Sequence, residues 1–131
     1  MLRKILSHVI LALVLIPLTA CSSAKQIALT AGDNGSQVEI KVGGEIVITL
    51  DGNPSTGFTW EANNLDASMF EQVGEPAFNS SNPGLVGSGG TLTLIFKALK
   101  AGSSTLTLVY HRPWETGVEP IDTFTVTVTV K

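Results

Sequence analysis

Polar and apolar residues alternate without exception in the C-terminal stretch Thr123-Phe124-Thr125-Val126-Thr127-Val128-Thr129-Val130. Successive side chains of a β-strand point to opposite faces of a sheet, so the apolar residues share one face and the threonines share the other. The β-branched residues valine and threonine are also favoured in strands. The stretch therefore predicts a half-buried strand, whose register is well specified because a slip of one residue would expose the whole apolar face.

The same period of two recurs upstream of this stretch. It is found in four further segments, Val38-Ile40-Val42, Ile46-Ile48-Leu50, Leu92-Leu94-Phe96 and Leu106-Leu108-Tyr110. Ile27 and Leu29 suggest an additional first strand, and residues 58–62 suggest another around Trp60, which we expect in the core. The sequence therefore predicts about seven strands.

Turn-forming residues separate these segments, as in Asp33-Asn34-Gly35, Gly43-Gly44 and Asn82-Pro83-Gly84. Long helical periodicity is absent, and only residues 65–70 could hold a helical turn. Short alternating strands without a βαβ rhythm predict an all-β fold, an immunoglobulin-like antiparallel β-sandwich. The Cys-Trp-Cys signature of true immunoglobulin domains is absent from the sequence.

The composition limits the chemistry available to the chain. It has 131 residues, 44% of them apolar and 15% charged, which supports one folded domain with a real core. Its single cysteine and two histidines exclude an internal disulfide framework and a Cys/His zinc site, so we expect no metal and no cofactor. A formal net charge of −3 gives no electrostatic reason to expect a nucleic-acid partner.

The N-terminus has the pattern of an export signal. Arg3 and Lys4 precede an apolar stretch whose core, residues 9–18, is far shorter than the roughly 20 residues that a membrane-spanning helix needs. The sequence Leu18-Thr19-Ala20-Cys21 resembles the lipobox of bacterial lipoproteins, which implies cleavage before Cys21 and acylation of this residue. The alternative is that Cys21 is an ordinary residue beside a signal cleavage site.

This resemblance divides the chain into three parts and implies a location. Residues 1–20 are expected to be a lipoprotein signal peptide, residues 21–25 a lipidated leash, and residues 26–131 the folded domain. Several acyl chains on Cys21 would hold the protein at a membrane in the bacterial cell envelope. Ser22, rather than aspartate, follows the cysteine, which in Gram-negative lipoproteins is typical of sorting to the outer membrane.

Three loops between the predicted strands have compositions that suit binding, which in a sandwich normally takes place in the loops. The first loop is Asn53-Pro54-Ser55-Thr56-Gly57-Phe58-Thr59-Trp60. Pro54 fixes its own φ and restricts Asn53, while Gly57 allows a backbone turn that other residues resist. This loop is therefore expected to be stiff before it meets a partner, and the alternative is an ordinary turn.

The second loop, Gly84-Leu85-Val86-Gly87-Ser88-Gly89-Gly90, has four glycines among seven residues. Its bare backbone could approach another protein closely and pair with an extended segment of it. The alternative is a flexible hairpin connection.

The third loop is His111-Arg112-Pro113-Trp114-Glu115-Thr116-Gly117. Arginine and tryptophan on either side of a rigid proline are typical of binding hot spots, because they bring large contact area with little freedom to lose. The alternatives are that Trp114 belongs to the core and that Arg112 is a solvated residue paired with Glu115. His111 is expected to be a structural neighbour, since no nucleophile accompanies it.

Taken in order, the three loops resemble the chagasin family of cysteine peptidase inhibitors. The family pattern is Asn-Pro-x-Thr-Gly followed by an aromatic residue and Trp, then Gly-x-Gly-Gly, then Arg-Pro-Trp. The chain departs from this pattern only at Ser55, where the family often has threonine, and at Phe58, where it often has tyrosine. The resemblance implies an immunoglobulin-like sandwich and reversible inhibition of papain-like cysteine peptidases.

The resemblance also implies which residues bind the peptidase. They are Asn53, Pro54, Ser55, Thr56, Gly57, Phe58, Gly87, Ser88, Gly89, Gly90, Arg112, Pro113 and Trp114. The segment around Thr56 would cover the catalytic cysteine and histidine of the target, and the glycine-rich loop would pair with its substrate-binding backbone. Arg112 and Trp114 would grip the primed side of the cleft.

Two other functions are open to the same sequence. An adhesion or assembly lipoprotein could use the sandwich to bind a protein partner without inhibiting any peptidase. An enzyme is not expected, because neither a Ser/His/Asp arrangement nor a carboxylate pair is signalled and the one cysteine lies at the N-terminus of the mature chain.

Overall fold

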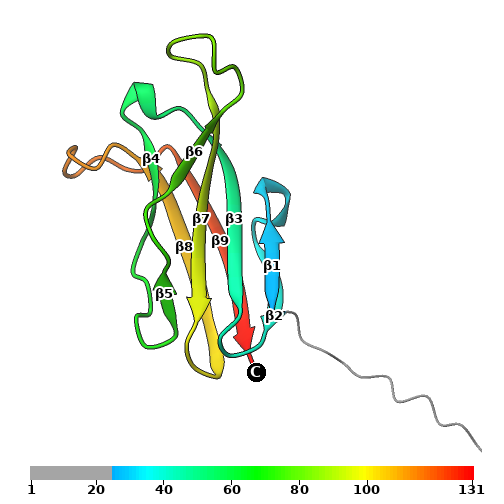
Figure 1. Ribbon diagram of the computed structural model, residues 1–131. Coiled ribbons are helices and arrows are strands. Elements are labelled where there is room, and N and C mark those ends of the chain that lie inside the picture. The colour runs from blue at the N-terminus through cyan, green and yellow to red at the C-terminus, as the bar shows by residue number, and fades with distance from the viewer. Residues whose placement is uncertain (1–24) are drawn as a thin grey trace, which may run out of the picture.

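The computed structural model describes residues 25–131, which form two facing β-sheets (Figure 1). The segment predicted to be a signal peptide and the predicted lipidation site Cys21 lie outside the described residues. The strands are β1 (Gln26–Leu29), β2 (Ser36–Ile40), β3 (Glu45–Gly52), β4 (Thr59–Ala62), β5 (Phe70–Gln72), β6 (Ala77–Ser80), β7 (Gly90–Ala98), β8 (Gly102–His111) and β9 (Asp122–Val130). Two 3₁₀ turns, η1 (Ala31–Asp33) and η2 (Pro54–Thr56), complete the fold. Within this part of the chain no helix is long and apolar enough to cross a membrane.

One sheet has the order β1-β3-β7-β5, with β6 also paired to β7, and the other has the order β2-β9-β8-β4. The prediction of an all-β sandwich is confirmed. The described residues form nine strands rather than about seven, because β5 and β6 are short edge strands that both pair with β7. Alternation does not mark β6, since its first three residues are exposed on both faces.

The sheets are not wholly antiparallel. β1 pairs with β3 and β2 pairs with β9 in parallel, whereas the other pairs are antiparallel. The chain changes sheets after β1 and again after β2, so β3 returns beside β1 and runs in the same direction. The expectation of an antiparallel sandwich therefore holds for the centre of each sheet and is wrong at the β1 and β2 edges.

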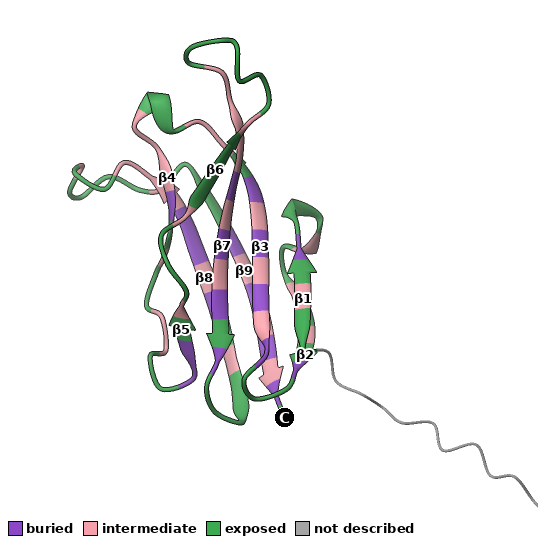
Figure 2. Cartoon of the chain, viewed as in Figure 1, coloured by how far each residue is buried: buried purple, intermediate pink, exposed green. Residues whose placement is uncertain are grey.

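Most of the alternating apolar residues meet between the two sheets, as the pattern predicts (Figure 2), but Val42 lies beyond the end of β2 and is 50% exposed. In the β3–β7 pair, Ile46 lies opposite Phe96 and Ile48 opposite Leu94, and all four side chains are buried. Trp60 is also in the core, as expected, with 3% of its surface exposed and its indole Nε1 donating to the Asp51 carbonyl oxygen at 3.0 Å. Full burial of such large apolar side chains contributes about 1.5–3 kcal/mol each.

Residues 65–70 form one hydrogen-bonded turn. The sequence predicts at most a single helical turn in this segment. The amides of Met69 and Phe70 both donate to the Asp66 carbonyl oxygen. The Asp66 side chain also accepts from the Ser68 hydroxyl and amide, and these hydrogen bonds lower the pKa of its carboxyl group. The turn leads Phe70 into the core at the start of β5.

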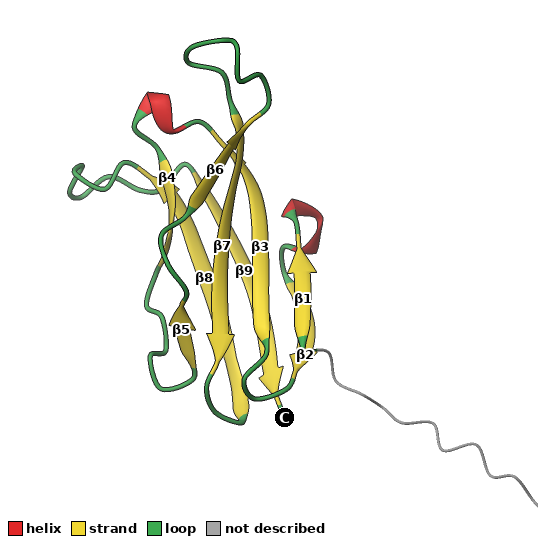
Figure 3. Ribbon diagram, viewed as in Figure 1, coloured by secondary structure: helices red, strands yellow, loops and turns green. Residues whose placement is uncertain are grey.

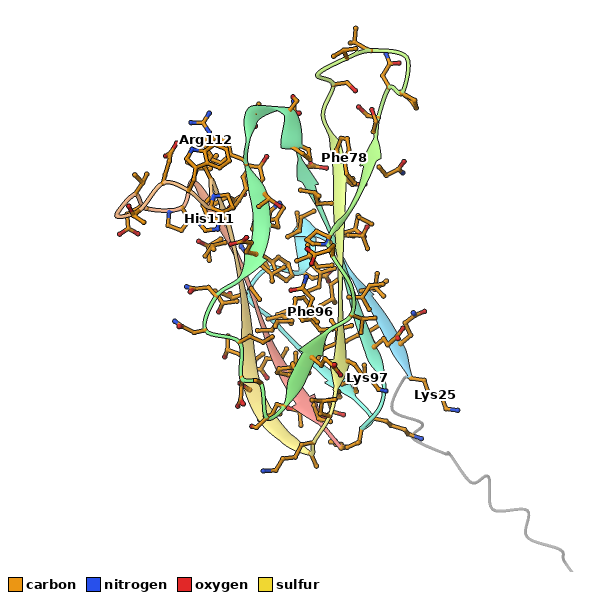
Figure 4. All side chains as sticks on the ribbon, turned by 60° about the vertical axis from the view of Figure 1, so that its left-hand side comes forward. Lys25, Phe78, Phe96, Lys97, His111 and Arg112 are labelled. Carbon is orange, nitrogen blue, oxygen red and sulfur yellow. The ribbon has the colours of Figure 1, made fainter. Side chains whose placement is uncertain are left out.

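The register of the strands brings the three loops to one end of the sandwich (Figure 3). The first loop follows the end of β3, and the second precedes the start of β7, where Gly90 pairs with Gly52. The third loop follows the end of β8, where His111 pairs with Thr59. β1 begins at the other end, where Gln26 pairs with Glu45, so Lys25 lies far from the loops (Figure 4).

Candidate functional site

The first loop is a tight turn closed by its own backbone. The Thr56 amide donates to the Asn53 carbonyl oxygen at 3.1 Å, and the Gly57 amide donates to that of Pro54 at 2.9 Å. The Asn53 side chain caps the turn, because its Oδ1 accepts from the amide of Ser55 at 3.2 Å. Gly57 has φ of 85°, a conformation that residues with a side chain rarely adopt. The loop is therefore formed before any partner arrives.

A tyrosine of β8 anchors this loop to the framework. The Asn53 amide donates to the Tyr110 hydroxyl at 2.9 Å. The Tyr110 ring lies between two aromatic neighbours, with ring centroids 5.3 Å from Phe58 and 5.1 Å from Trp60. Phe58 therefore connects the loop to the buried aromatic cluster, and the sequence pattern, which counted Tyr110 as an apolar strand residue, did not reveal this hydroxyl contact.

The second loop is joined to the first by one side chain. Asn53 Nδ2 donates to the Gly87 carbonyl oxygen at 3.0 Å. The Ser88 hydroxyl is turned inward, 2.7 Å from that of Ser80 and 3.1 Å from the Asn82 carbonyl oxygen. Ser88 therefore holds the loop together, and at the tip Leu85 is 60% exposed and Val86 is fully exposed.

The two adjacent glycines of this loop have different surroundings. A Cβ atom on Gly90 would overlap the backbone of Asn79 in the neighbouring strand β6, so Gly90 is required by the fold itself. A Cβ atom on Gly89 would meet nothing closer than the Gly52 carbonyl oxygen at 3.7 Å, which is an ordinary contact. The fold of the free protein therefore has room for a side chain at position 89.

The third loop also contacts the first. Arg112 Nε donates to the Thr56 carbonyl oxygen at 3.0 Å, and its guanidinium lies 4.4 Å from the centre of the Phe58 ring. Arg112 Nη1 is 3.1 Å from Glu115 Oε1, so the pairing considered as an alternative from the sequence is present in the structure. Figure 4 shows Arg112 and His111 together at this end of the molecule, with Lys25 at the opposite end.

Trp114 is not a core residue, since 66% of its surface is exposed. Its ring lies directly over Gly57, where a Cβ atom would collide with the indole Cη2. Pro113 connects Trp114 to Arg112 in an exposed turn closed by the Glu115 amide, which donates to the Arg112 carbonyl oxygen at 3.1 Å. His111 pairs with Glu61 of β4 at 2.7 Å, which supports its interpretation as a structural neighbour.

The three interconnected loops form one continuous surface at one end of the β-sandwich, which is where proteins of this architecture commonly carry their binding residues. The sequence model of the family described as Chagasin family peptidase inhibitor I42 matches residues 39–128, and the chain belongs to this family. The resemblance seen in the three motifs is therefore confirmed, as is the expectation of a peptidase inhibitor rather than an enzyme.

Individual relatives agree over most of the domain. Amoebiasin-1 of Entamoeba histolytica is 30% identical over 105 residues, which cover 80% of this chain and 100% of the relative. Chagasin of Trypanosoma cruzi is 31% identical over 104 residues, covering 75% and 92%. The crystal structure of a cysteine protease inhibitor from Entamoeba histolytica superposes with a TM-score of 0.70 at 30% identity, covering 81% of this chain and 96% of that one.

Proposed function

We propose that the chain reversibly inhibits papain-like cysteine peptidases by placing its first loop in the catalytic cleft, with the second and third loops on either side. The observation that carries the proposal is the connection of all three loops into one surface. Asn53 connects the first loop to the second, and Arg112 connects it to the third. The three loops would therefore bind as a unit.

Such a surface binds with little loss of conformational freedom. An interface of the usual size buries roughly 1,600 Å², and its affinity depends more on preorganisation than on area. The exposed side chains of Leu85 and Val86 in the second loop and of Trp114 in the third loop supply apolar contacts. Bare backbone at Gly89 allows an extended segment of the peptidase to approach closely.

Incubation of papain with the soluble domain and a chromogenic substrate tests this proposal. Residues 22–131 suffice, because both sheets and the buried core lie within residues 25–131. We expect inhibition that depends on dose and is reversed by dilution. A domain that leaves turnover unchanged at every concentration would contradict the proposal and favour the alternative of an adhesion or assembly protein.

A charge at Gly89 should weaken inhibition without affecting the fold. Gly89→Glu adds a side chain where the backbone of the peptidase would approach, and we expect the inhibition constant to rise about tenfold or more. Thermal melting should remain near that of the wild type because the site is open in the free protein. Ser103→Glu adds the same charge at the opposite end of β8 and should inhibit normally. An unchanged constant for Gly89→Glu would remove the second loop from the interface.

We further propose that the protein is a lipoprotein of the bacterial cell envelope, anchored through Cys21 and, in a Gram-negative cell, sorted to the outer membrane. The lipobox sequence supports the anchor. The position of Lys25 at the end of the sandwich opposite the loops supports the orientation, because a lipid a few residues upstream would leave the loops directed away from the membrane (Figure 4).

Cys21→Ser tests the anchor. Acylation requires the thiol, so the variant should move from the detergent-dependent membrane fraction to the soluble fraction. Ser22→Ala is the matched control, since it leaves the thiol in place and should remain with the membrane. If Cys21→Ser still fractionates like the wild type, the lipobox interpretation is wrong.

A further inference from the structure

The Arg112 side chain is occupied within the inhibitor itself. Its Nε donates to the Thr56 carbonyl oxygen at 3.0 Å, its Nη1 pairs with Glu115 at 3.1 Å, and its guanidinium stacks on Phe58. We propose that Arg112 is a positioning residue that holds the Thr56 carbonyl away from the catalytic thiolate of the target, so that the first loop occupies the cleft uncleaved. This inference rests on the proposed function.

Cleavage of the first loop would follow the ordinary chemistry of a cysteine peptidase. The thiolate sulfur would bond to the Thr56 carbonyl carbon, and the Gly57 nitrogen would leave with a proton from the catalytic histidine. Water would then hydrolyse the thioester and leave a carboxylate on Thr56. The reaction needs an extended segment whose carbonyl oxygen points at the oxyanion-stabilising N–H groups of the enzyme.

The loop meets neither requirement in the free inhibitor. Its backbone is curled, with Gly57 at φ of 85° rather than in the extended region. The carbonyl oxygens of Asn53 and Pro54 accept hydrogen bonds from within the loop. The Thr56 carbonyl instead accepts from a side chain of another loop. Of these three carbonyl groups, that of Thr56 is therefore oriented by Arg112 and not by a hydrogen bond within the turn.

The geometry also fixes Arg112 in place. Glu115 holds the outer end of the guanidinium and the Phe58 ring supports its face, while Trp114 covers the Gly57 side of the same peptide bond. Both sides of the Thr56–Gly57 bond are thus held by the third loop. Loss of Arg112 frees the carbonyl side, and the peptide plane can then turn toward an extended, cleavable conformation.

Incubation with a molar excess of papain, followed by mass spectrometry over time, tests the inference. Arg112→Ala and Arg112→Met both remove the Nε donor, and the methionine keeps apolar contact with Phe58. For both variants we expect a break at Thr56–Gly57 at a rate roughly tenfold or more above that of the wild type, since a hydrogen bond from a charged donor is lost. Glu115→Gln is the matched control, because it removes the ion pair but keeps the hydrogen bond from Arg112 Nε to the Thr56 carbonyl oxygen. The Thr56–Gly57 bond of this variant should remain uncleaved.

The outcomes separate the inference from the function on which it rests. A wild-type domain that does not inhibit papain would contradict the proposed function itself. If the wild type inhibits and the Arg112 variants only bind more weakly while remaining intact, Arg112 contacts the peptidase directly and the inference is wrong. Cleavage at other bonds, or a lowered melting temperature with general proteolysis, would show a loss of structure rather than release of the Thr56 carbonyl and would also overturn it.

Discussion

Gly57→Val should raise the inhibition constant by about 100-fold or more. A valine here must adopt a positive φ, which costs roughly 1–2 kcal/mol, and its Cβ would occupy the position of the Trp114 ring. Either the tryptophan is displaced or the first loop changes shape. The first outcome alone costs on the order of 2 kcal/mol of binding, and the second removes the fit to the cleft. Inhibition of papain with the melting temperature measured in parallel checks this result.

Gly74→Val is the matched control for backbone strain. Gly74 lies between β5 and β6 with φ of 72°, and a Cβ atom there would meet nothing within 4 Å. Both variants should therefore carry comparable backbone strain, but only Gly57→Val also meets Trp114 and should lose inhibition. Equal inhibition by the two variants would show that the contact between Gly57 and Trp114 has no part in binding.

Trp114→Ala should weaken inhibition by roughly 30-fold, equivalent to about 2 kcal/mol, because a large aromatic anchor commonly contributes on that scale. The effect should appear mainly as faster dissociation. The melting temperature should remain near that of the wild type, since Trp114 is 66% exposed. Stopped-flow or surface-based kinetics with an inactivated peptidase separates the two rate constants.

Val118→Ala provides a comparison close to the third loop. Val118 is 57% exposed and follows Gly117, so its truncation removes exposed apolar surface from a residue that lies outside the three loop motifs. We expect little change in affinity. If Trp114→Ala leaves the dissociation rate unchanged, or if it unfolds the domain, then Trp114 is not the anchor of the third loop.

Strand prediction succeeded where a strand has one buried and one exposed face. β3, β7 and β9 alternate in burial along their central residues, and β8 does so until Leu108, after which Val109 is also buried. β5 has only three residues, and the first three residues of β6 are all exposed. Neither strand therefore has the alternation of apolar and polar residues from which a strand can be predicted. Both are held by pairing with β7, which is contact between distant segments.

The same distinction applies to the site. The three loops were recognised from local composition, since proline and glycine restrict or release the backbone wherever they stand. The alternatives for Trp114 and Arg112 were open in the sequence, because exposure and pairing depend on what folds nearby. The structure places Trp114 outside the core and pairs Arg112 with Glu115 and Thr56.

Local chemistry along the chain was enough to establish an all-β sandwich and three candidate loops, since alternation and turn residues act over a few positions. The connection between those loops required the fold. Asn53 meets Gly87 across 34 positions and Arg112 meets Thr56 across 56, and pairs so distant in sequence come together only when the register of β3, β7 and β8 is fixed. The orientation of the loops away from Lys25 has the same origin, because strand direction is a property of the assembled sheets.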